Sequence, residues 1–160
     1  MDGPRACKTQ EFDEVISLIN MVFRKDSDQD IATDYPLVFN HPMIEYMRIV
    51  KVDDKVVSHV PVAPKEIVAK NDRFIVGIIS PTVTHPDYRH HGYGSLCLRD
   101  CVKIMENQNW PISALWTQVA TFPFYQNSGW EAVGCQGWMY LLDSNDTNLF
   151  LNNNVYKISK

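Results

Sequence analysis

An arginine and two glycines stand between an apolar run and an amphipathic segment. Arg89, Gly92 and Gly94 give the pattern Arg-x-x-Gly-x-Gly. The first turn of a helix has backbone N–H groups without partners inside the helix, and the helix dipole adds positive charge there. Because glycine has no Cβ, such a backbone can approach a bulky anion closely. The pattern predicts a phosphate or pyrophosphate site; the alternative is only a tight turn from a strand into a helix.

Other phosphate-binding loops have different spacing. No Gly-Lys-Ser/Thr follows the glycines, so the segment is not a P-loop. The dinucleotide fingerprint Gly-x-Gly-x-x-Gly is also missing. The loop therefore needs another explanation.

The neighbouring residues predict a strand, a loop and a helix. Residues 74–79 are apolar and rich in β-branched side chains, which is typical of a buried strand. Pro81 cannot donate to a sheet ladder, so we expect a bulge or a break in pairing there. After the glycines, apolar residues at helical spacing predict a helix to about Asn107, which ends before Pro111.

The first half of the chain predicts one long helix, one short helix and a hairpin. Thr9 is the expected cap of the first helix, whose apolar stripe comprises Phe12, Val15, Ile16, Ile19, Val22 and Phe23. A short helix should end before Pro36. Residues 43–52 and 56–62 read as strands around the turn Asp53-Asp54, the second strand continuing to residue 69. The strand 74–79 then completes a meander.

The second half continues with alternating elements. Residues 112–116 read as a strand parallel to 74–79, because a helix crossover joins them. A short helix is expected around residues 123–127, a long strand at 131–142, and a further short strand at 155–158.

The pattern at Arg89, Gly92 and Gly94 resembles the acetyl-CoA-binding motif of the GCN5-related N-acetyltransferase (GNAT) superfamily. A second segment, residues 122–130, is similar to that family's Phe/Leu-Tyr-x-x-x-Gly-Phe sequence, with Tyr125 in the tyrosine place and Trp130 in the final aromatic place. The segment departs from many members at Gln118 and Thr121, where asparagine and alanine are common.

The resemblance implies a mixed α/β (α+β) fold in three layers, with an antiparallel meander, splayed central strands and flanking helices. It implies acetyl-CoA as co-substrate, with the pyrophosphate at His90 to Ser95 and the pantetheine beside Thr82 to Thr84. The expected cofactor-binding residues are Thr82, Val83, Thr84, Arg89, His90, His91, Gly92, Tyr93, Gly94, Ser95 and Gln118.

The implied reaction is acyl transfer from the thioester to a primary amine, directly and in a ternary complex. Tyr125 is the expected general acid for the leaving thiolate, and a backbone N–H near Val83 or Thr84 would stabilise the oxyanion. The general base is open between a water chain and four side chains: Glu45, His59, Glu66 and His85.

Composition narrows the class of protein. The 160 residues suit one domain, or the first domain of a longer protein, and the net charge of −4 argues against a nucleic-acid binder. With no signal peptide and no apolar membrane span, we expect a cytoplasmic protein without a membrane partner, and a homodimer is compatible. Cys97 and Cys101 should pack as small apolar residues on the helix. Nothing at a ligand spacing predicts a metal.

Two rival functions stay open from the sequence. One is a non-catalytic acyl-CoA sensor with the same fold, and the other is a nucleotide-binding module that uses only the glycine loop. The acidic stretch from residues 26 to 34 either faces a cationic substrate or is a solvated loop, and charge runs usually indicate the second.

Overall fold

The structure is a computed structural model that describes residues 1–132 except 26, 37 and 71. Met1–Trp130 form one compact unit. The elements below all belong to this unit. The strands expected at 131–142 and 155–158 lie outside the described residues, apart from the first two positions of the former.

The sheet has the order β1-β2-β3-β4-β6. Its strands are β1 (Asp2–Ala6), β2 (Met47–Val52), β3 (Lys55–Ala69), β4 (Asp72–Ile79) and β6 (Ile112–Ala114). The first four are antiparallel in turn, whereas β6 runs parallel to β4. The two-residue β5 (Val83–Thr84) pairs with the other end of β3. The meander and the parallel strand were predicted.

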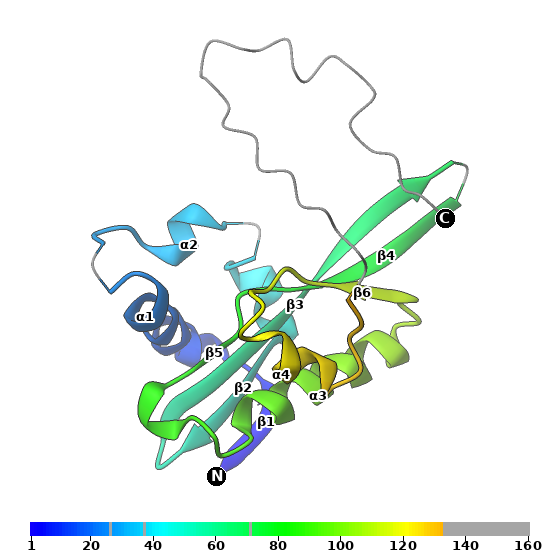
Figure 1. The fold of residues 1–160 in the computed structure, drawn as a ribbon. Coiled ribbons are helices and arrows are strands. Elements are labelled where there is room, and N and C mark those ends of the chain that lie inside the picture. Colours follow the sequence, from blue (N-terminus) through cyan, green and yellow to red (C-terminus); the bar gives the residue numbers. More distant parts are fainter. Residues whose placement is uncertain (26, 37, 71, 133–160) are drawn as a thin grey trace, which may run out of the picture. The chain divides into compact units, whose positions relative to one another are not determined.

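Helices cover both faces of this sheet (Figure 1). They are α1 (Phe12–Phe23), α2 (Ile31–Asp34), α3 (Tyr93–Asn107) and α4 (Phe122–Gln126), with 3-10 turns η1 (Thr9–Glu11), η2 (His41–Tyr46) and η3 (Pro86–Tyr88). Strand side chains alternate between faces. Ile49 and Val56 therefore belong to the core beneath α1, and Val50 and Val57 to the core beneath α3. The expected three-layer α/β arrangement is confirmed.

The N-terminal details were predicted less well. The strand β1 was not expected, because Gly3 and Pro4 are poor strand residues. It forms by pairing with β2, and Gly3 fits there because a Cβ would collide with the carbonyl oxygen of Ile49. Thr9 is not the cap of α1: it begins η1, and the Glu11 carboxylate accepts a hydrogen bond from the Lys8 N–H at 2.9 Å.

Several predicted element boundaries move. Residues 43–46 belong to η2, so β2 begins only at Met47, because Asn40 accepts from the Met43 N–H and Pro42 occupies the first turn. β4 begins at Asp72 rather than 74, and β6 ends at Ala114 rather than 116. β3 continues past Pro64, and α2 and α3 end where the prolines predicted. None of the described helices could cross a membrane.

Candidate active site

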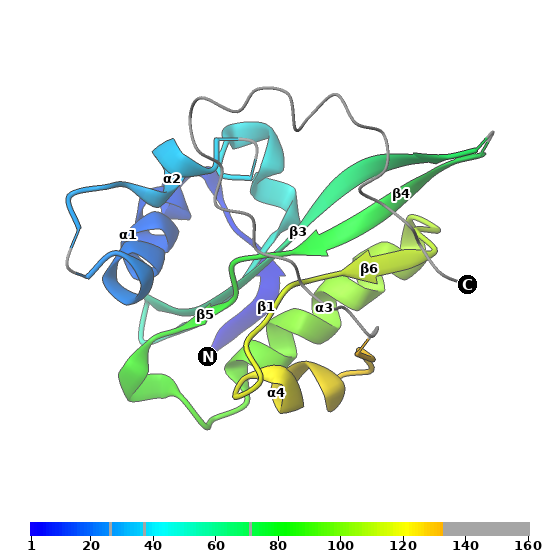
Figure 2. The same cartoon turned by 45° about the horizontal axis from the view of Figure 1, so that its top comes forward.

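The two central strands separate at one end. β4 pairs with β6 over only three residues, from Val76↔Ile112 to Ile78↔Ala114. Beyond Ile79 the chain passes through Ser80, Pro81 and Thr82 and then pairs with β3 as β5. Figure 2 shows β5 and the chain after β6 leading away from each other. The break in pairing predicted at Pro81 is confirmed, and it opens a gap between two backbones.

A pocket of about 860 Å³ lies where the strands separate. Such a volume is in the range of small-molecule and cofactor sites. Its walls come from the end of α1, the segment from β4 to α3, and the segment from β6 to α4. The residues that line it are Val22, Phe23, Ile79, Ser80, Pro81, Thr82, Val83, Thr84, Tyr88, Arg89, His90, Gly92, Tyr93, Gly94, Ser95, Trp116, Thr117, Gln118, Thr121, Phe124 and Tyr125.

The glycine loop leads into the first turn of α3. Gly92 is the N-cap with φ of 80°, and His90 also has a positive φ of 64°. The first hydrogen bond within the helix runs from the Leu96 N–H to the Gly92 carbonyl at 3.0 Å. The N–H groups of Tyr93, Gly94 and Ser95 therefore have no helical partner. They are available to an anion in the pocket.

Gly94 is where the helix meets β5. It is buried, and a Cβ there would come to 3.2 Å from Thr84 Oγ1 and 3.4 Å from the Phe124 ring. The Thr84 hydroxyl is in turn 2.9 Å from Ser58 Oγ, which also donates to the Val83 carbonyl at 3.2 Å. The small Gly94 thus lets the helix N-terminus approach β5 closely, and the hydroxyl pair joins β5 to β3.

One edge of β5 pairs with β3, and the opposite edge has no partner strand among the described residues. The His85 N–H donates to the Val57 carbonyl at 2.8 Å. Because backbone groups in a strand alternate in direction, the Val83 N–H also turns to β3 and the Thr84 N–H turns to the opposite edge. No described strand pairs with that edge. Two backbone N–H groups were expected near an oxyanion, those of Val83 and Thr84. Pairing with β3 uses the Val83 N–H, so only the Thr84 N–H stays available among these two.

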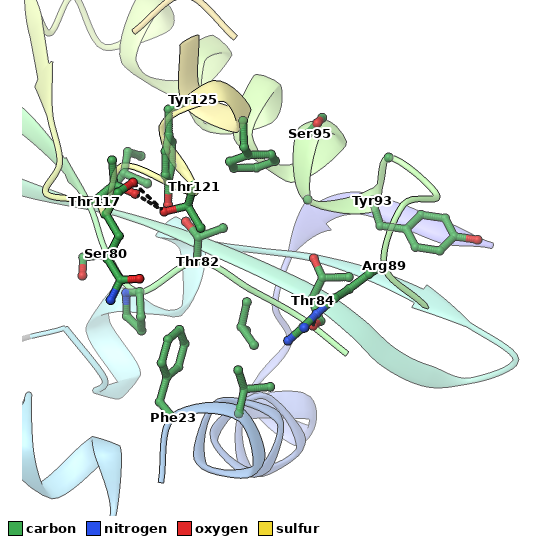
Figure 3. Close-up of a pocket in the computed structure, with 18 of the residues that line it drawn as sticks. Phe23, Ser80, Thr82, Thr84, Arg89, Tyr93, Ser95, Thr117, Thr121 and Tyr125 are labelled. Atoms are coloured by element: carbon green, nitrogen blue, oxygen red, sulfur yellow. Dashed lines mark hydrogen bonds between the residues drawn. The ribbon is translucent and has the colours of Figure 1, made fainter. Parts of the chain in front are cut away.

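Tyr125 lies on α4, at the opposite wall of the pocket from Phe23 (Figure 3). The side chain is buried, with an exposed fraction of 9%. Its ring packs edge-on against Phe124, with centroids 4.9 Å apart, and against Trp130 at 6.5 Å. Gly129, with φ of 98°, follows the end of α4. These contacts fix the ring, while the residue still contributes to the pocket wall.

The predicted site residues lie together, with one exception. All except His91 line this pocket. The His91 ring is 2.8 Å from the Arg89 carbonyl through Nδ1 and stacks on Tyr93, with centroids 5.7 Å apart. The His91 ring is therefore held between its own loop and Tyr93 at the start of α3, and it does not line the pocket.

Charge in the pocket is of one sign. Arg89 and His90 are the lining residues that can carry positive charge, and no described lining residue is an aspartate or glutamate. Arg89 Nε donates to the Thr84 carbonyl at 3.4 Å. Partial charge from the helix start adds to this. The pocket can therefore hold a polyanion.

None of the four proposed general bases lines the pocket. Glu45 is exposed, and Glu66 forms an exposed ion pair with Arg73 at 3.1 Å. His85 Nε2 lies 2.9 Å from Lys55 Nζ, and its Nδ1 lies 3.3 Å from the Asp87 backbone nitrogen. His59 is fully buried beside Phe39, and burial lowers its pKa to about 3. His85 is close to the glycine loop in sequence, but it precedes η3 and its ring contacts Lys55 of β3 instead of the pocket.

Sequence reasoning missed one wall of the pocket. Val22 and Phe23 were assigned to helix packing, yet both line the pocket, and 46% of Phe23 is exposed. Trp116 was expected in a strand but follows β6 and is 80% exposed. The available signal was that Val22 and Phe23 come last in their helix, just before a polar loop.

The sequence matches the acetyltransferase (GNAT) domain family over residues 4–133. The matched range contains both motifs and every described strand except the first residues of β1. No curated protein sequence matches at a significant level.

Solved structures show the same fold. Glucosamine-6-phosphate N-acetyltransferase from Arabidopsis thaliana is 15% identical, with a TM-score of 0.67 over 85% of this chain and 95% of that one. A predicted acetyltransferase from Clostridium acetobutylicum, solved with acetyl-CoA, is 14% identical with a TM-score of 0.67 over 86% and 94%. An acetyltransferase from Trypanosoma brucei is 16% identical with a TM-score of 0.65 over 86% and 97%.

Fold and sequence therefore define the class as an acyltransferase that uses acetyl-CoA. More narrowly, the chain belongs to the GNAT family of N-acetyltransferases.

Proposed function

We propose that this protein transfers an acetyl group from acetyl-CoA to a primary amine by direct attack in a ternary complex. The observation that carries the proposal is a single pocket lined by the free N–H groups at the start of α3, the open edge of β5 and the buried Tyr125. The N–H groups and the edge of β5 are suited to hold the donor, and Tyr125 is suited to assist the departure of the CoA thiolate.

The donor would be held mainly by backbone groups. The pyrophosphate would accept from the N–H groups of Tyr93, Gly94 and Ser95, with Arg89 and His90 adding positive charge. The pantetheine would lie along β5 beside Thr82 to Thr84, and Gln118 on the facing wall could bond one of its amides. His91 would contribute its backbone only.

In the chemical step, the amine nitrogen attacks the thioester carbonyl carbon. The new C–N bond forms, the C–S bond breaks, and the thiolate leaves. The Thr84 N–H could stabilise the oxyanion, and Tyr125 would give its proton to the thiolate. As the amide forms, the neutral amine loses one proton to water, since no carboxylate among the described lining residues can accept it, and water returns a proton to the Tyr125 phenolate.

Direct transfer is favoured over an acetyl-enzyme because no described cysteine is placed for attack. Cys7, Cys97 and Cys101 are buried, and none lines the pocket. Burial raises the pKa of the Cys7 and Cys97 thiols to about 12 and raises that of Cys101 further. A thiol with such a pKa is a poor nucleophile at neutral pH.

The test combines titration calorimetry with an assay for free CoA thiol. Acetyl-CoA and CoA should bind with micromolar affinity and ATP far more weakly, and a panel of amines should include some that release CoA in proportion to acetylated amine. Equal binding of ATP would contradict the donor site. Donor binding without turnover of any amine would indicate a sensor instead. An acetylated protein after mixing with acetyl-CoA alone would exclude direct transfer.

A further inference from the structure

A second cavity adjoins the first where the strands separate. Its volume is about 370 Å³. It shares Phe23, Ser80, Pro81 and Trp116 with the larger pocket. Its other walls are residues from the end of α1, from α2 and the residues after it, and from β4, namely Arg24, Ile31, Tyr35, Val38 and Ile78. We call it the α2 cavity. A molecule seated in it would reach the open strand gap.

Aromatic and aliphatic side chains form most of the α2 cavity. Phe23, Tyr35 and Trp116 keep exposed fractions of 46%, 53% and 80%. Large apolar side chains with this much exposure, gathered around one hollow, are typical of ligand sites. Phe23 stands on the α1 side of the site, below Ser80 and Thr82 (Figure 3). An apolar ligand would cover all three rings.

The charges near the α2 cavity are already paired. Its lining contains one ionisable cation, Arg24, which binds the Asp34 carboxylate at 2.6 Å. Asp30 accepts from the Ala32 N–H at 2.7 Å and from Asn20 Nδ2 at 3.2 Å, so it caps α2. Asp28 is exposed and lines neither cavity. Of the acidic stretch, these three described aspartates do not face the site, as expected for a solvated loop.

We infer that the acetyl acceptor is a monoamine with an apolar, aromatic body, and that this body binds in the α2 cavity. The inference rests on the proposed function and makes it specific. The shared wall of Phe23 and Trp116 would direct the amine from the α2 cavity to the strand gap.

Two costs disfavour a polycationic acceptor. Each extra ammonium group would lose water against apolar walls without a carboxylate to replace it. The positive charge of Arg89, His90 and the helix start would also repel it. An aromatic monoamine has one ammonium group, and apolar surroundings favour its neutral form, which is the form that attacks. The lack of a described general base at the pocket thus agrees with the same class of acceptor.

Binding can be tested without turnover, because Trp116 is a fluorescent reporter within the site. The titrations are made in the presence of CoA. Tryptamine is avoided because its own indole fluoresces, so 2-phenylethylamine and tyramine serve as aromatic probes, and spermidine and lysine serve as cationic probes. We expect the aromatic amines to change the fluorescence with affinities at least tenfold tighter than spermidine. The change should disappear in Trp116→Phe, which identifies the reporter.

Two variants of α1 distinguish a specific effect on the α2 cavity from a general effect on the protein. Phe23→Ala should raise the KM for 2-phenylethylamine about tenfold and leave the affinity for CoA within a factor of about two. Met21→Ala is the matched control: it is an exposed apolar residue of α1, 41% exposed, and lines neither cavity. Met21→Ala should change neither the KM for 2-phenylethylamine nor the affinity for CoA.

The outcomes distinguish the two proposals. Aromatic binding without acetylation would support the acceptor cavity and contradict the proposed function. Acetylation of spermidine or lysine in preference to aromatic amines would support the function and overturn the acceptor class. Failure of every aromatic amine to bind, or an equal effect of Phe23→Ala and Met21→Ala, would also overturn it.

Discussion

At the scale of the residue, Tyr125 has the most direct test. Tyr125→Phe removes one hydroxyl and leaves the ring contacts with Phe124 and Trp130. Loss of a general acid typically slows a reaction about 10²- to 10⁴-fold. We expect kcat to fall by about two orders of magnitude while the Kd for acetyl-CoA is unchanged, as measured by CoA release and calorimetry. Tyr46→Phe, outside the pocket, is the control. Undiminished turnover would remove Tyr125 from its proposed role.

His59 makes a prediction about acid stability. Neither of its ring nitrogens has a hydrogen-bond partner among the described residues, and burial lowers its pKa to about 3 from 6.5. Between those values the unfolded chain binds a proton that the folded chain cannot, so stability falls as pH falls below 6.5. His59→Leu should reduce the loss of unfolding free energy between pH 7 and pH 5 by about 2 kcal/mol in urea titrations. If His59→Leu loses as much unfolding free energy between pH 7 and pH 5 as the wild type does, another group causes that loss.

At the scale of the element, the loop before α3 depends on a left-handed residue. Gly92 has φ of 80° and Gly129 has φ of 98°, and a Cβ at either would meet no atom within 4 Å. Alanine at each should cost about 1–2 kcal/mol of stability. Only Gly92→Ala should weaken acetyl-CoA binding, by about tenfold, because its methyl group would stand where the anion approaches. Equal affinities of the two variants in calorimetry would contradict a pyrophosphate site at this loop.

Elements with strong local signals could be predicted, whereas their ends could be predicted only where a proline marks them. Pro81 and Pro111 indicated the strand break and the end of α3, and the apolar periodicity indicated the packing faces of α1 and α3. β1 had no local signal, because Gly3 and Pro4 become a strand only by pairing with β2. The residues proposed to bind the donor followed from a short motif, and all but His91 line one pocket. The wall formed by Phe23 and Trp116 is assembled by tertiary structure, so the place of Phe23 at the end of its helix was only a weak signal and Trp116 had none.

At the scale of the molecule, one ionic cluster joins β1, the entry to α1, and β2. The Glu11 carboxylate accepts from Arg5 through two bonds of 2.8 Å and lies 3.5 Å from Lys51 Nζ. These partners lower the pKa of Glu11 from 4.5 to about 2, chiefly through Arg5. Stability contributed by Glu11 is therefore complete above pH 4.5 and is lost as pH falls toward 2, by about 3 kcal/mol at most.

Replacing this carboxylate should destabilise the whole unit. Glu11→Gln should lower the free energy of unfolding by about 2 kcal/mol at pH 7, because Arg5 and Lys51 lose a buried partner. The difference from wild type should nearly vanish at pH 2. Glu66→Gln, which breaks an exposed pair with Arg73, should cost less than about 1 kcal/mol. Equal effects of the two changes in chemical denaturation would show that burial is not decisive here.

The separation of β4 from β6 also bears on how this molecule could acquire a new specificity. The proposed donor side would consist largely of backbone N–H groups at the start of α3 and along β5, which most substitutions leave in place. The proposed acceptor side would depend on the identities of a few rings at the end of α1 and after β6. Random mutation spread evenly over both walls should therefore change the choice of amine often and the choice of acyl carrier seldom. Laboratory evolution that starts from this chain would explore acceptors while the carrier stays fixed.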